Sequence, residues 1–187
     1  MDRRLIEETF PIKEIGNESV YEKRQRIGHP SGIHPWWARR PLAASIATIY
    51  LSLVDFKNEK NAKSKIEKAI EISKWSNFRI YENMEKIQKD FMKGKIRPKI
   101  LDPFSGSGMI PLQAFRLGCD TYATDYNPVS NVILKCGIEY INKNSIKIDK
   151  TKFADVDAPK KIKKDFLKWS NWVFKQLEKE VGSFFSN

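Results

Sequence analysis

The sequence lacks a long hydrophobic run, and this absence excludes one class of protein. Its longest apolar stretch, residues 42–54, is interrupted by serine and threonine. A membrane-spanning helix needs roughly 18 or more apolar residues. The first residues, Met-Asp-Arg-Arg-Leu-Ile-Glu-Glu, carry charges where a secretory signal has an apolar segment. We therefore expect a cytoplasmic chain that does not enter a membrane.

Cysteine and histidine are also scarce. Cys119 and Cys136 are the only cysteines, and His29 and His34 are the only histidines. Two cysteines are too few for a zinc site of their own, and they suit buried thiols in a reducing compartment. The histidines have no partner at metal-ligand spacing, so we predict no bound metal.

Positive charge is abundant. The chain has 34 Lys and Arg residues against 23 Asp and Glu residues, a net charge of +11. Residues 142–187 hold 11 lysines and 6 acidic residues. Such a surface attracts polyanions and suits a nucleic-acid partner. Lysine-rich helices that are merely solvated fit the same composition, and charge alone leaves both interpretations open.

The composition changes along the chain and divides it into four segments, 1–56, 57–95, 96–141 and 142–187. Within residues 1–41 we predict a short leading helix followed by an extended, aromatic-rich segment, which we call the arm. Pro41 then opens a buried helix. The second segment predicts two amphipathic helices, separated near residues 73–77, with Gly94 ending the second. The fourth predicts one further amphipathic helix over residues 159–181.

The third segment predicts a β-α-β-α unit. Residues 99–102 have the pattern of a short buried strand, and residues 121–124 that of a second strand. Residues 109–117 have helical periodicity followed by Gly118. A further helix begins at Pro128 and runs to about Tyr140. Two strands joined by a helical crossover pair in parallel, so we predict an α/β fold of Rossmann-like type.

The sharpest signal is the sequence Asp-Pro-Phe-Ser-Gly-Ser-Gly at residues 102–108. A glycine-rich turn after a strand places a ligand at the carboxyl end of the sheet, and Gly106 and Gly108 permit positive φ and close approach. Asp125 ends the second strand, where a carboxylate can accept hydrogen bonds from ribose hydroxyls. Each such bond contributes roughly 1.5–3 kcal/mol.

The turn favours S-adenosylmethionine (SAM) over a phosphorylated cofactor. Neither the dinucleotide fingerprint G-x-G-x-x-G nor the phosphate-binding G-x-x-x-x-G-K-[S/T] is present. A pyrophosphate at this turn would face the like charge of Asp102. SAM has no phosphate, and its ammonium and sulfonium groups would be attracted by that carboxylate.

These residues, continued by Pro-Leu-Gln-Ala-Phe-Arg-Leu-Gly and Asp-Tyr-Asn-Pro-Val, resemble the first two cofactor motifs of DNA amino-methyltransferases. The resemblance implies that Asp102 contacts the SAM ammonium, Asp125 holds the ribose, and Tyr126 flanks the adenine. Asn127 shapes the turn that follows. The residues implied to surround the methionine part are Pro103, Phe104, Ser105, Gly106, Ser107 and Gly108.

The sequence His-Pro-Trp-Trp-Ala-Arg-Arg-Pro at residues 34–41 resembles the N-terminal domain of large prokaryotic adenine-specific DNA methylases. The likeness covers residues 3–54 and about 97–140, and implies the first strands of a class I methyltransferase sheet with extra N-terminal, inserted and C-terminal helices. Three roles stay open for the arm: closing the SAM pocket, contacting DNA, or packing as core with internal ion pairs. The residues concerned are His34, Trp36, Trp37 and Arg39.

The family's catalytic motif, (Asp/Asn/Ser)-Pro-Pro-(Tyr/Phe/Trp), is absent, since the chain has no Pro-Pro pair. The motif supplies the acceptor and stacking ring for a flipped base. We predict no catalytic residue, and two strands leave sheet edges uncovered. We therefore expect the SAM-binding N-terminal portion of a DNA adenine-N6 methyltransferase, truncated or split, that meets DNA through a second polypeptide carrying the motif. Alternatives are a non-catalytic SAM- or nucleic-acid-binding module, or a subunit of an RNA or protein methyltransferase.

Overall fold

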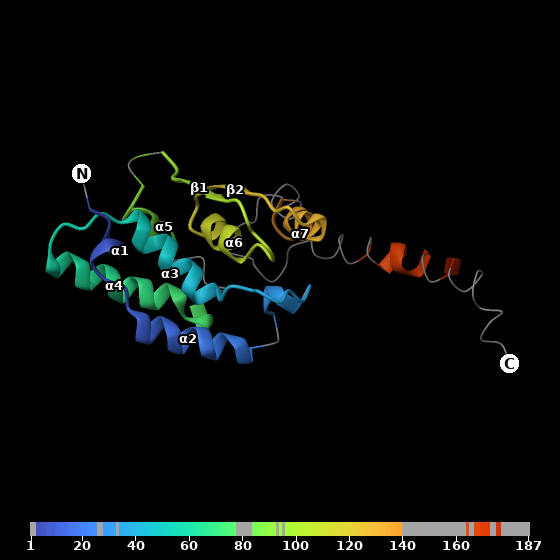
Figure 1. Cartoon of the computed structure of the whole chain (residues 1–187), viewed down its shortest axis with the longest axis horizontal. Helices are drawn as coiled ribbons and strands as arrows, with labels where there is room; N and C mark the ends of the chain where they lie inside the picture. The colour runs from blue at the N-terminus through green and yellow to red at the C-terminus, as the bar shows by residue number, and fades with distance from the viewer. Residues whose placement is uncertain are drawn as a thin grey trace. The chain divides into compact units, whose positions relative to one another are not determined.

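The computed structural model describes residues 3–25, 28–32, 34–77, 84–92, 94, 96–139, 164, 167–172 and 175–176. The chain divides into two compact units, Met1–Ile138 and Glu139–Asn187. The first unit is mixed α/β, mostly helical with a small parallel sheet (Figure 1). It holds the predicted segments 1–56 and 57–95 and nearly all of 96–141.

Helix α3 (Leu42–Leu53) lies at the centre of the first unit. It packs against α1 (Leu5–Glu8), α2 (Ile12–Arg24), α4 (Glu59–Ser73) and α6 (Met109–Arg116). Eight of its residues are buried, as the apolar sequence predicts, and Pro41 stands at its N-cap. Proline is tolerated there because the first N–H groups of a helix have no intrahelical partner. The predicted buried helix is confirmed.

Helix α2 corrects the sequence prediction for the first segment, which expected extended chain after one short helix. Pro11 lies at its N-cap, where proline does not break a helix. Gly16 lies inside it at a cost of about 0.5–1 kcal/mol relative to alanine. Tertiary burial of Ile15 and Glu22 offsets that cost, and local propensity alone does not reveal it.

The charged second segment contains α4, a 3₁₀ turn at Trp75–Asn77, and α5 (Met84–Gln88). The helix α4 and the predicted separation near residues 73–77 are confirmed. The second helix ends at Gln88 and not at Gly94, because the chain leaves α5 in turns closed by bonds to Ile87 and Gln88. The part of that prediction resting on residues 78–83 lies outside the described residues.

Asp90 ties this segment to α3 and α4. Its carboxylate accepts hydrogen bonds from the Tyr50 hydroxyl at 2.6 Å and from the amines of Lys65 and Lys68. Burial by itself raises the pKa of Asp90, but the hydrogen bonds from these three side chains outweigh it, and the pKa lies below its usual value. Burial, together with Asp90, raises the pKa of Tyr50.

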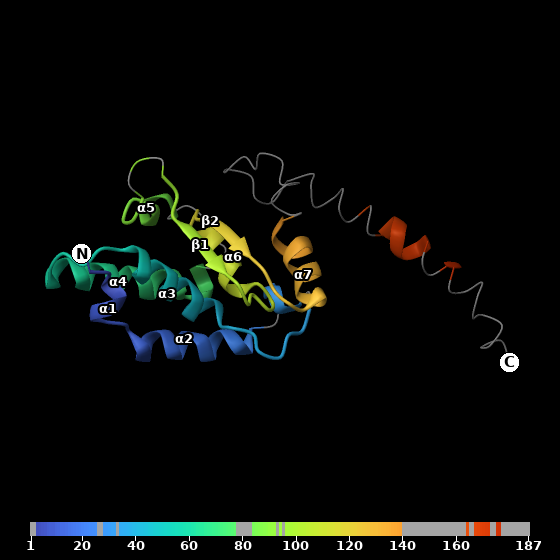
Figure 2. The same ribbon diagram turned by 45° about the horizontal axis from the view of Figure 1, so that its top comes forward.

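Strands β1 (Lys99–Asp102) and β2 (Asp120–Ala123) pair in parallel, joined through α6 (Figure 2). Gly118 follows α6 with φ of +81°. The parallel pair and α6 are confirmed, with β2 beginning one residue before the predicted position. The predicted burial of residues 99–102 is wrong, because only Asp102 of β1 is buried and Leu101 is on the uncovered face of the sheet. Helix α7 (Pro128–Leu134) follows β2 and continues as a π-helical turn at Lys135–Glu139. The predicted end near Tyr140 lies outside the described residues.

Helix α6 covers one face of this two-stranded sheet. On the other face, Leu101 and Tyr122 are exposed and stand opposite each other in the register. Ile100, which points the other way, packs against the core. Within the described residues, the sheet therefore has an uncovered apolar face, as predicted for an incomplete sheet. A larger Rossmann-like sheet stays a prediction.

The two cysteines differ in environment. Cys119 is buried next to β2, and its pKa is raised to about 11 by burial and by the neighbouring Asp120. Cys136 is exposed on the π-helical turn. The prediction of buried thiols is therefore right for Cys119 and wrong for Cys136.

In the second unit, residues 167–172 are helical, within the predicted helix at 159–181. Trp169 and Trp172 are exposed, with ring centroids 6.1 Å apart and planes at 78°, and the Lys168 amine lies 5.6 Å from the Trp169 ring.

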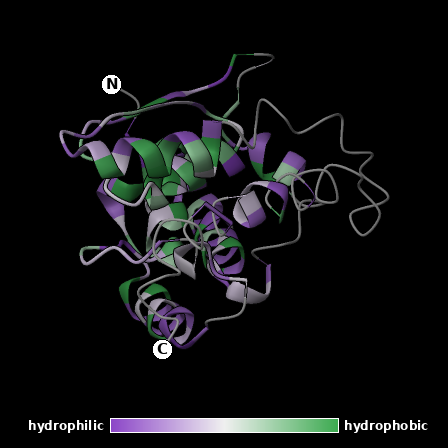
Figure 3. Cartoon of the chain, turned by 90° about the vertical axis from the view of Figure 1, so that its right-hand side faces the viewer, coloured by the Kyte–Doolittle hydropathy of each residue, from purple (hydrophilic) through white to green (hydrophobic). Residues whose placement is uncertain are grey.

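Figure 3 shows hydrophobic and hydrophilic bands alternating along the helices. Across the described part of the chain, each helix is too short or too polar to cross a membrane.

Candidate functional site

The carboxyl ends of β1 and β2 bring together the two carboxylates that the sequence singled out. Asp102 is the last residue of β1, and Asp125 follows β2 by two residues. The glycine-rich turn of residues 103–108 lies between them, because the backbone N–H of Gly106 donates to Asp125 Oδ2 at 2.7 Å. Residues 23 positions apart in sequence thus form one site.

Hydrogen bonds to its own neighbours hold this turn in place. Ser105 donates its N–H to Thr124 O at 3.0 Å and its hydroxyl to Asp102 O at 2.8 Å. The Ser130 hydroxyl of α7 donates to Gly106 O at 2.5 Å, and Gly108 N–H donates to Ser105 O at 2.8 Å. The turn is therefore organised before any ligand arrives, which lowers the entropy that binding has to overcome.

Both glycines of the turn have positive φ, as predicted: +52° at Gly106 and +76° at Gly108. A Cβ on Gly106 would lie 2.8 Å from Trp36 Nε1, and one on Gly108 would lie 2.8 Å from Leu134 Cδ2. The space that these glycines leave open is therefore filled by the protein's own side chains.

Asp125 is anchored on both oxygens. Oδ1 accepts from Asn127 N–H at 2.8 Å, and Oδ2 accepts from Gly106 N–H. These two bonds, first that from Asn127, hold the pKa of Asp125 below its usual value. Since a carboxylate oxygen has two lone pairs, each oxygen retains acceptor capacity for a ligand hydroxyl. Asn127 also caps α7 through Val129 N–H at 2.9 Å, the turn-shaping role expected of it.

Asp102 has one satisfied oxygen and one unsatisfied oxygen. Oδ1 accepts from Phe104 N–H at 3.2 Å, whereas Oδ2 is buried and has no hydrogen-bond partner among the described residues. A buried unpaired acceptor costs about 1–3 kcal/mol, and more when it is charged. The buried Oδ2 is therefore an acceptor that the described residues leave unsatisfied.

Two aromatic rings beside these carboxylates are in solvent. Phe104 is 84% exposed and Tyr126 is 99% exposed. Single exposed rings are common on protein surfaces, so exposure alone does not mark these two as ligand contacts. They flank Asp102 and Asp125 in sequence and offer flat apolar surface to a planar group at this end of the sheet.

The arm reaches the turn through two of its four predicted residues. Trp36 lies against Gly106, and the His34 ring is 6.4 Å from the Trp36 ring. Trp37 is 98% exposed, and Arg39 is directed away, to Ser31 and His29. The adjacent tryptophans therefore differ: one packs on the turn and the other is in solvent.

A cavity of about 250 Å³ lies where the arm, the turn and α7 meet. Pro30 and His34 line it from the arm, and Ser107 and Gly108 from the turn. Its other walls are apolar: Met109, Leu112, Val129, Val132, Ile133, Cys136, Gly137 and Ile138. It is smaller than the roughly 300–1,000 Å³ of typical small-molecule sites, and the two carboxylates do not line it.

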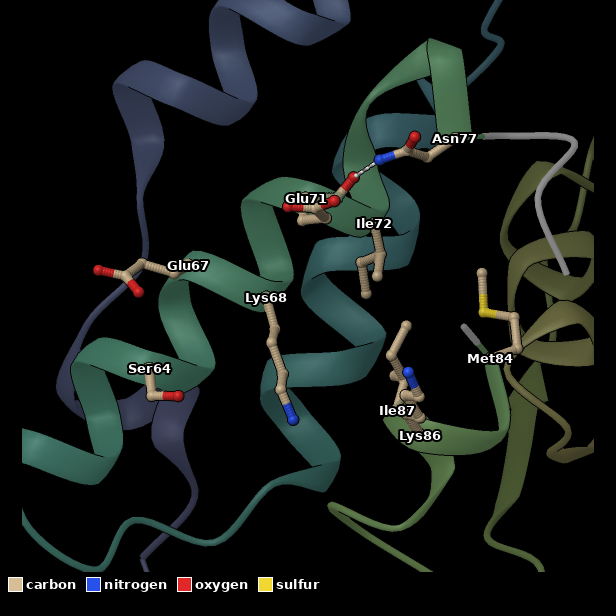
Figure 4. Close-up of a pocket in the computed structure, with 9 residues that line it drawn as sticks. All are labelled: Ser64, Glu67, Lys68, Glu71, Ile72, Asn77, Met84, Lys86 and Ile87. Atoms are coloured by element: carbon tan, nitrogen blue, oxygen red, sulfur yellow. Dashed lines mark hydrogen bonds between the residues drawn. The ribbon is translucent and has the colours of Figure 1, made fainter. Parts of the chain in front are cut away.

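A second cavity, of about 350 Å³, lies between α4 and α5 (Figure 4) and contains no residue of the predicted site. Its lining residues are Ser64, Glu67, Lys68, Glu71, Ile72, Asn77, Met84, Lys86 and Ile87.

Across the described residues, no three His, Cys, Asp or Glu side chains gather as a metal site requires.

Sequence reasoning missed the residues that support the site. Ser130 and the Asn131 amide, which donates to Asp125 O at 2.8 Å, have no motif of their own. Their position in the first turn of α7 could have identified them, because the helix that follows a strand begins beside the carboxyl ends of the strands. The buried pairing of Glu22 with His29 was also missed, since a contact between separate elements leaves no local pattern.

Comparison with known proteins gives one match. A model for a family of proteins of unknown function (DUF1156) matches residues 9–77. That stretch runs from the start of α2 through the arm and α3 to the end of the turn after α4, and stops before the glycine-rich turn. No curated protein and no solved structure matches the chain.

Proposed function

We propose that this chain binds S-adenosylmethionine at the carboxyl ends of β1 and β2, as the N-terminal portion of a DNA adenine-N6 methyltransferase. The proposal includes a larger Rossmann-like sheet, to which a second polypeptide contributes. Bound SAM would supply an activated methyl group for transfer to an amino nitrogen. The residues of this chain would bind and orient it.

The observation that carries the proposal is the hydrogen bond from Gly106 N–H to the Asp125 carboxylate. It joins the glycine-rich turn after one strand to the acidic residue after its parallel neighbour. This end of a parallel sheet is where α/β folds bind nucleotides. The free lone pairs of Asp125 suit the two hydroxyls of a ribose, and Tyr126 next to it suits the adenine ring.

The charge of the site favours SAM over a nucleotide with phosphates. The Oδ2 of Asp102 has no partner among the described residues, and it would accept a cationic donor and would repel a pyrophosphate. Phe104, which follows it, is exposed at the mouth of the turn. Asp102 would therefore hold the ammonium of the methionine part, and Phe104 would shield it from water.

A second chain accounts for what is missing. The sequence lacks the Pro-Pro motif that would receive the target amino group. Leu101 and Tyr122 leave apolar sheet surface uncovered, and β1 and β2 have unpaired edges among the described residues. A partner that pairs strands with an edge and packs apolar side chains on the uncovered face would complete the sheet and carry the motif.

Calorimetry with SAM tests the cofactor claim. We expect binding by the purified chain, and at least about a tenfold weaker binding by Asp125→Ala, which is about 1.4 kcal/mol. Asp120→Ala is the matched control, because Asp120 lies at the opposite end of the same strand, and its affinity should stay within twofold. Absence of SAM binding by the chain, alone or with its partner, would refute the proposal.

A methyl-transfer assay on adenine-containing DNA tests whether catalysis needs a second polypeptide. The chain alone should transfer no methyl group, and transfer should appear on adding a polypeptide with an Asp-Pro-Pro-Tyr type motif. Robust transfer by the chain alone would show that an acceptor site exists without that motif. Transfer to RNA or protein and not to DNA would identify a different substrate class.

A nucleic-acid-binding module is the second candidate, and the tryptophan pair of the second unit favours it. Trp169 and Trp172 are exposed beside Lys168 in a lysine-rich segment, an arrangement that suits base stacking and phosphate pairing. We expect single-stranded DNA to bind with steep salt dependence, and Trp172→Ala to weaken it severalfold. Unchanged affinity in this variant would exclude the tryptophan pair as the binding surface.

A further inference from the structure

A buried cluster lies beneath the arm, where α2, the arm and α3 meet. Glu22 is 2% exposed and His29 is 4% exposed. Glu22 Oε1 lies 2.9 Å from His29 Nε2, and Oε2 accepts from Ala43 N–H at 2.9 Å in the first turn of α3. One carboxylate of α2 thus holds both the start of the arm and the start of the central helix.

The neighbours of His29 determine where its proton lies. Ser31 N–H donates to Nδ1 at 3.1 Å, so Nδ1 carries no proton and Nε2 donates to Glu22. The Arg39 guanidinium donates to Nδ1 at 3.2 Å and to the Ser31 hydroxyl. The imidazole also stacks on Trp75, with centroids 5.2 Å apart and planes at 17°. The ring is therefore fixed in position, orientation and tautomer.

These contacts close the base of a loop whose tip reaches the glycine-rich turn. We call residues 29–32 and 34–39 the arm loop. His29 and Ser31 at one end are bonded to Arg39 at the other. Between the ends, Trp36 lies against Gly106, and His34 lines the cavity beside the turn. The base of the loop is fixed to the helices, and its middle packs on the candidate site.

We propose that Glu22 and His29 are positioning residues that set the place of Trp36 on Gly106, and through it the affinity of the turn for its nucleoside cofactor. This inference rests on the proposed function. When the base of the arm loop is released, Trp36 leaves Gly106 for part of the time. The apparent dissociation constant then rises by the factor by which the competent population falls.

Glu22→Gln is the main test, made in the full chain and measured by SAM calorimetry. The glutamine amide has one acceptor oxygen, whereas Ala43 N–H and His29 Nε2–H are two donors, so one contact is lost. If a tenth of the molecules keep the loop in place, the apparent dissociation constant rises about tenfold. Tyr50→Phe is the control. It removes a buried hydrogen bond to Asp90 elsewhere in the core and should leave the affinity within twofold.

A double-mutant cycle separates positioning from general weakening of the fold. If Glu22 acts through Trp36, Glu22→Gln should change the affinity less than twofold in a Trp36→Ala background. A full tenfold effect in that background would overturn the proposal, as would unchanged affinity in a folded Glu22→Gln single variant. If Glu22→Gln does not fold, Ser31→Ala takes its place as the test. It removes the hydroxyl partner of Arg39 and leaves no buried charge unpaired, and it should weaken SAM binding about threefold.

Amide hydrogen exchange distinguishes failure of this inference from failure of the proposed function. In the chain without SAM, Glu22→Gln or Ser31→Ala should speed exchange at residues 105–108, and Tyr50→Phe should not. If the wild-type chain binds no SAM but these amides respond as stated, the proposed function fails and the positioning role stands. If the amides do not respond in the folded variants, the positioning role is refuted whether or not SAM binds.

Discussion

Replacing Gly106 with alanine tests the contact between the arm and the glycine-rich turn. At a φ of +52°, an alanine side chain is strained by roughly 1–2 kcal/mol. The substitution also restricts the unfolded chain, and this offsets about 0.4–1 kcal/mol of that strain. The new Cβ would also lie 2.8 Å from Trp36 Nε1, too close for either to stay in place. Displacing the indole adds the roughly 1–3 kcal/mol that overpacking costs, for a total destabilisation of about 1–5 kcal/mol.

Urea unfolding followed by far-ultraviolet circular dichroism measures this loss without depending on tryptophan emission. Gly16→Ala is the control, since that residue lies inside α2 with no atom within 4 Å of an added Cβ. It should stabilise the chain by about 0.5–1 kcal/mol. In a Trp36→Ala background, Gly106→Ala should keep its backbone strain and lose the steric part. Equal destabilisation in both backgrounds would refute the claim that Trp36 occupies the space above Gly106.

Three other predictions follow from the buried groups. Under native conditions near pH 8 a thiol reagent should label one cysteine per chain, and Cys136→Ser should abolish that labelling, because Cys119 is buried with a pKa of about 11. The free energy of unfolding should fall as the pH drops below 3.8, the ordinary aspartate pKa. The lowered pKa of Asp90 in the folded chain means that its carboxylate stabilises the fold only while it is ionised. In acid titrations of the unfolding free energy, Asp90→Asn should flatten this dependence. Tyr50→Phe should destabilise the fold by roughly 1 kcal/mol in urea, through loss of its hydrogen bond to Asp90, and no change would mean that this bond is absent in solution.

Local signals predicted several elements correctly for identifiable reasons. Pro41 followed by small and apolar residues predicted α3, and Gly118 marked the end of α6, because helix ends have residue preferences that do not depend on distant contacts. Strand β1 was recognisable because it ends at the glycine-rich turn, and β2 because it follows Gly118 at the end of α6. These features are written in neighbouring residues.

Predictions failed where distant contacts outweigh local preference. Residues 12–24 are helical although Gly16 weakens a helix, because Ile15 and Glu22 are buried against other elements. The second helix of the charged segment stops at Gln88, and the turn beyond it is tied to α3 and α4 through Asp90. Tertiary contacts of this kind exceed the fraction of a kilocalorie per residue by which helix propensities differ.

In the candidate site, the sequence alone determined the kinds of group and their order: a carboxylate, a glycine-rich turn, and a second carboxylate after the next strand. Positive φ at Gly106 and Gly108 follows from the absence of a Cβ, and needs no knowledge of the rest of the chain. Tertiary structure decided which groups meet. It set Trp36 on Gly106 while leaving Trp37 in solvent, and it left Asp102 Oδ2 without a partner among the described residues. The physical reason is that residue type and order fix local backbone preferences and chemistry, whereas contact between the arm and the turn depends on packing across segments about seventy residues apart.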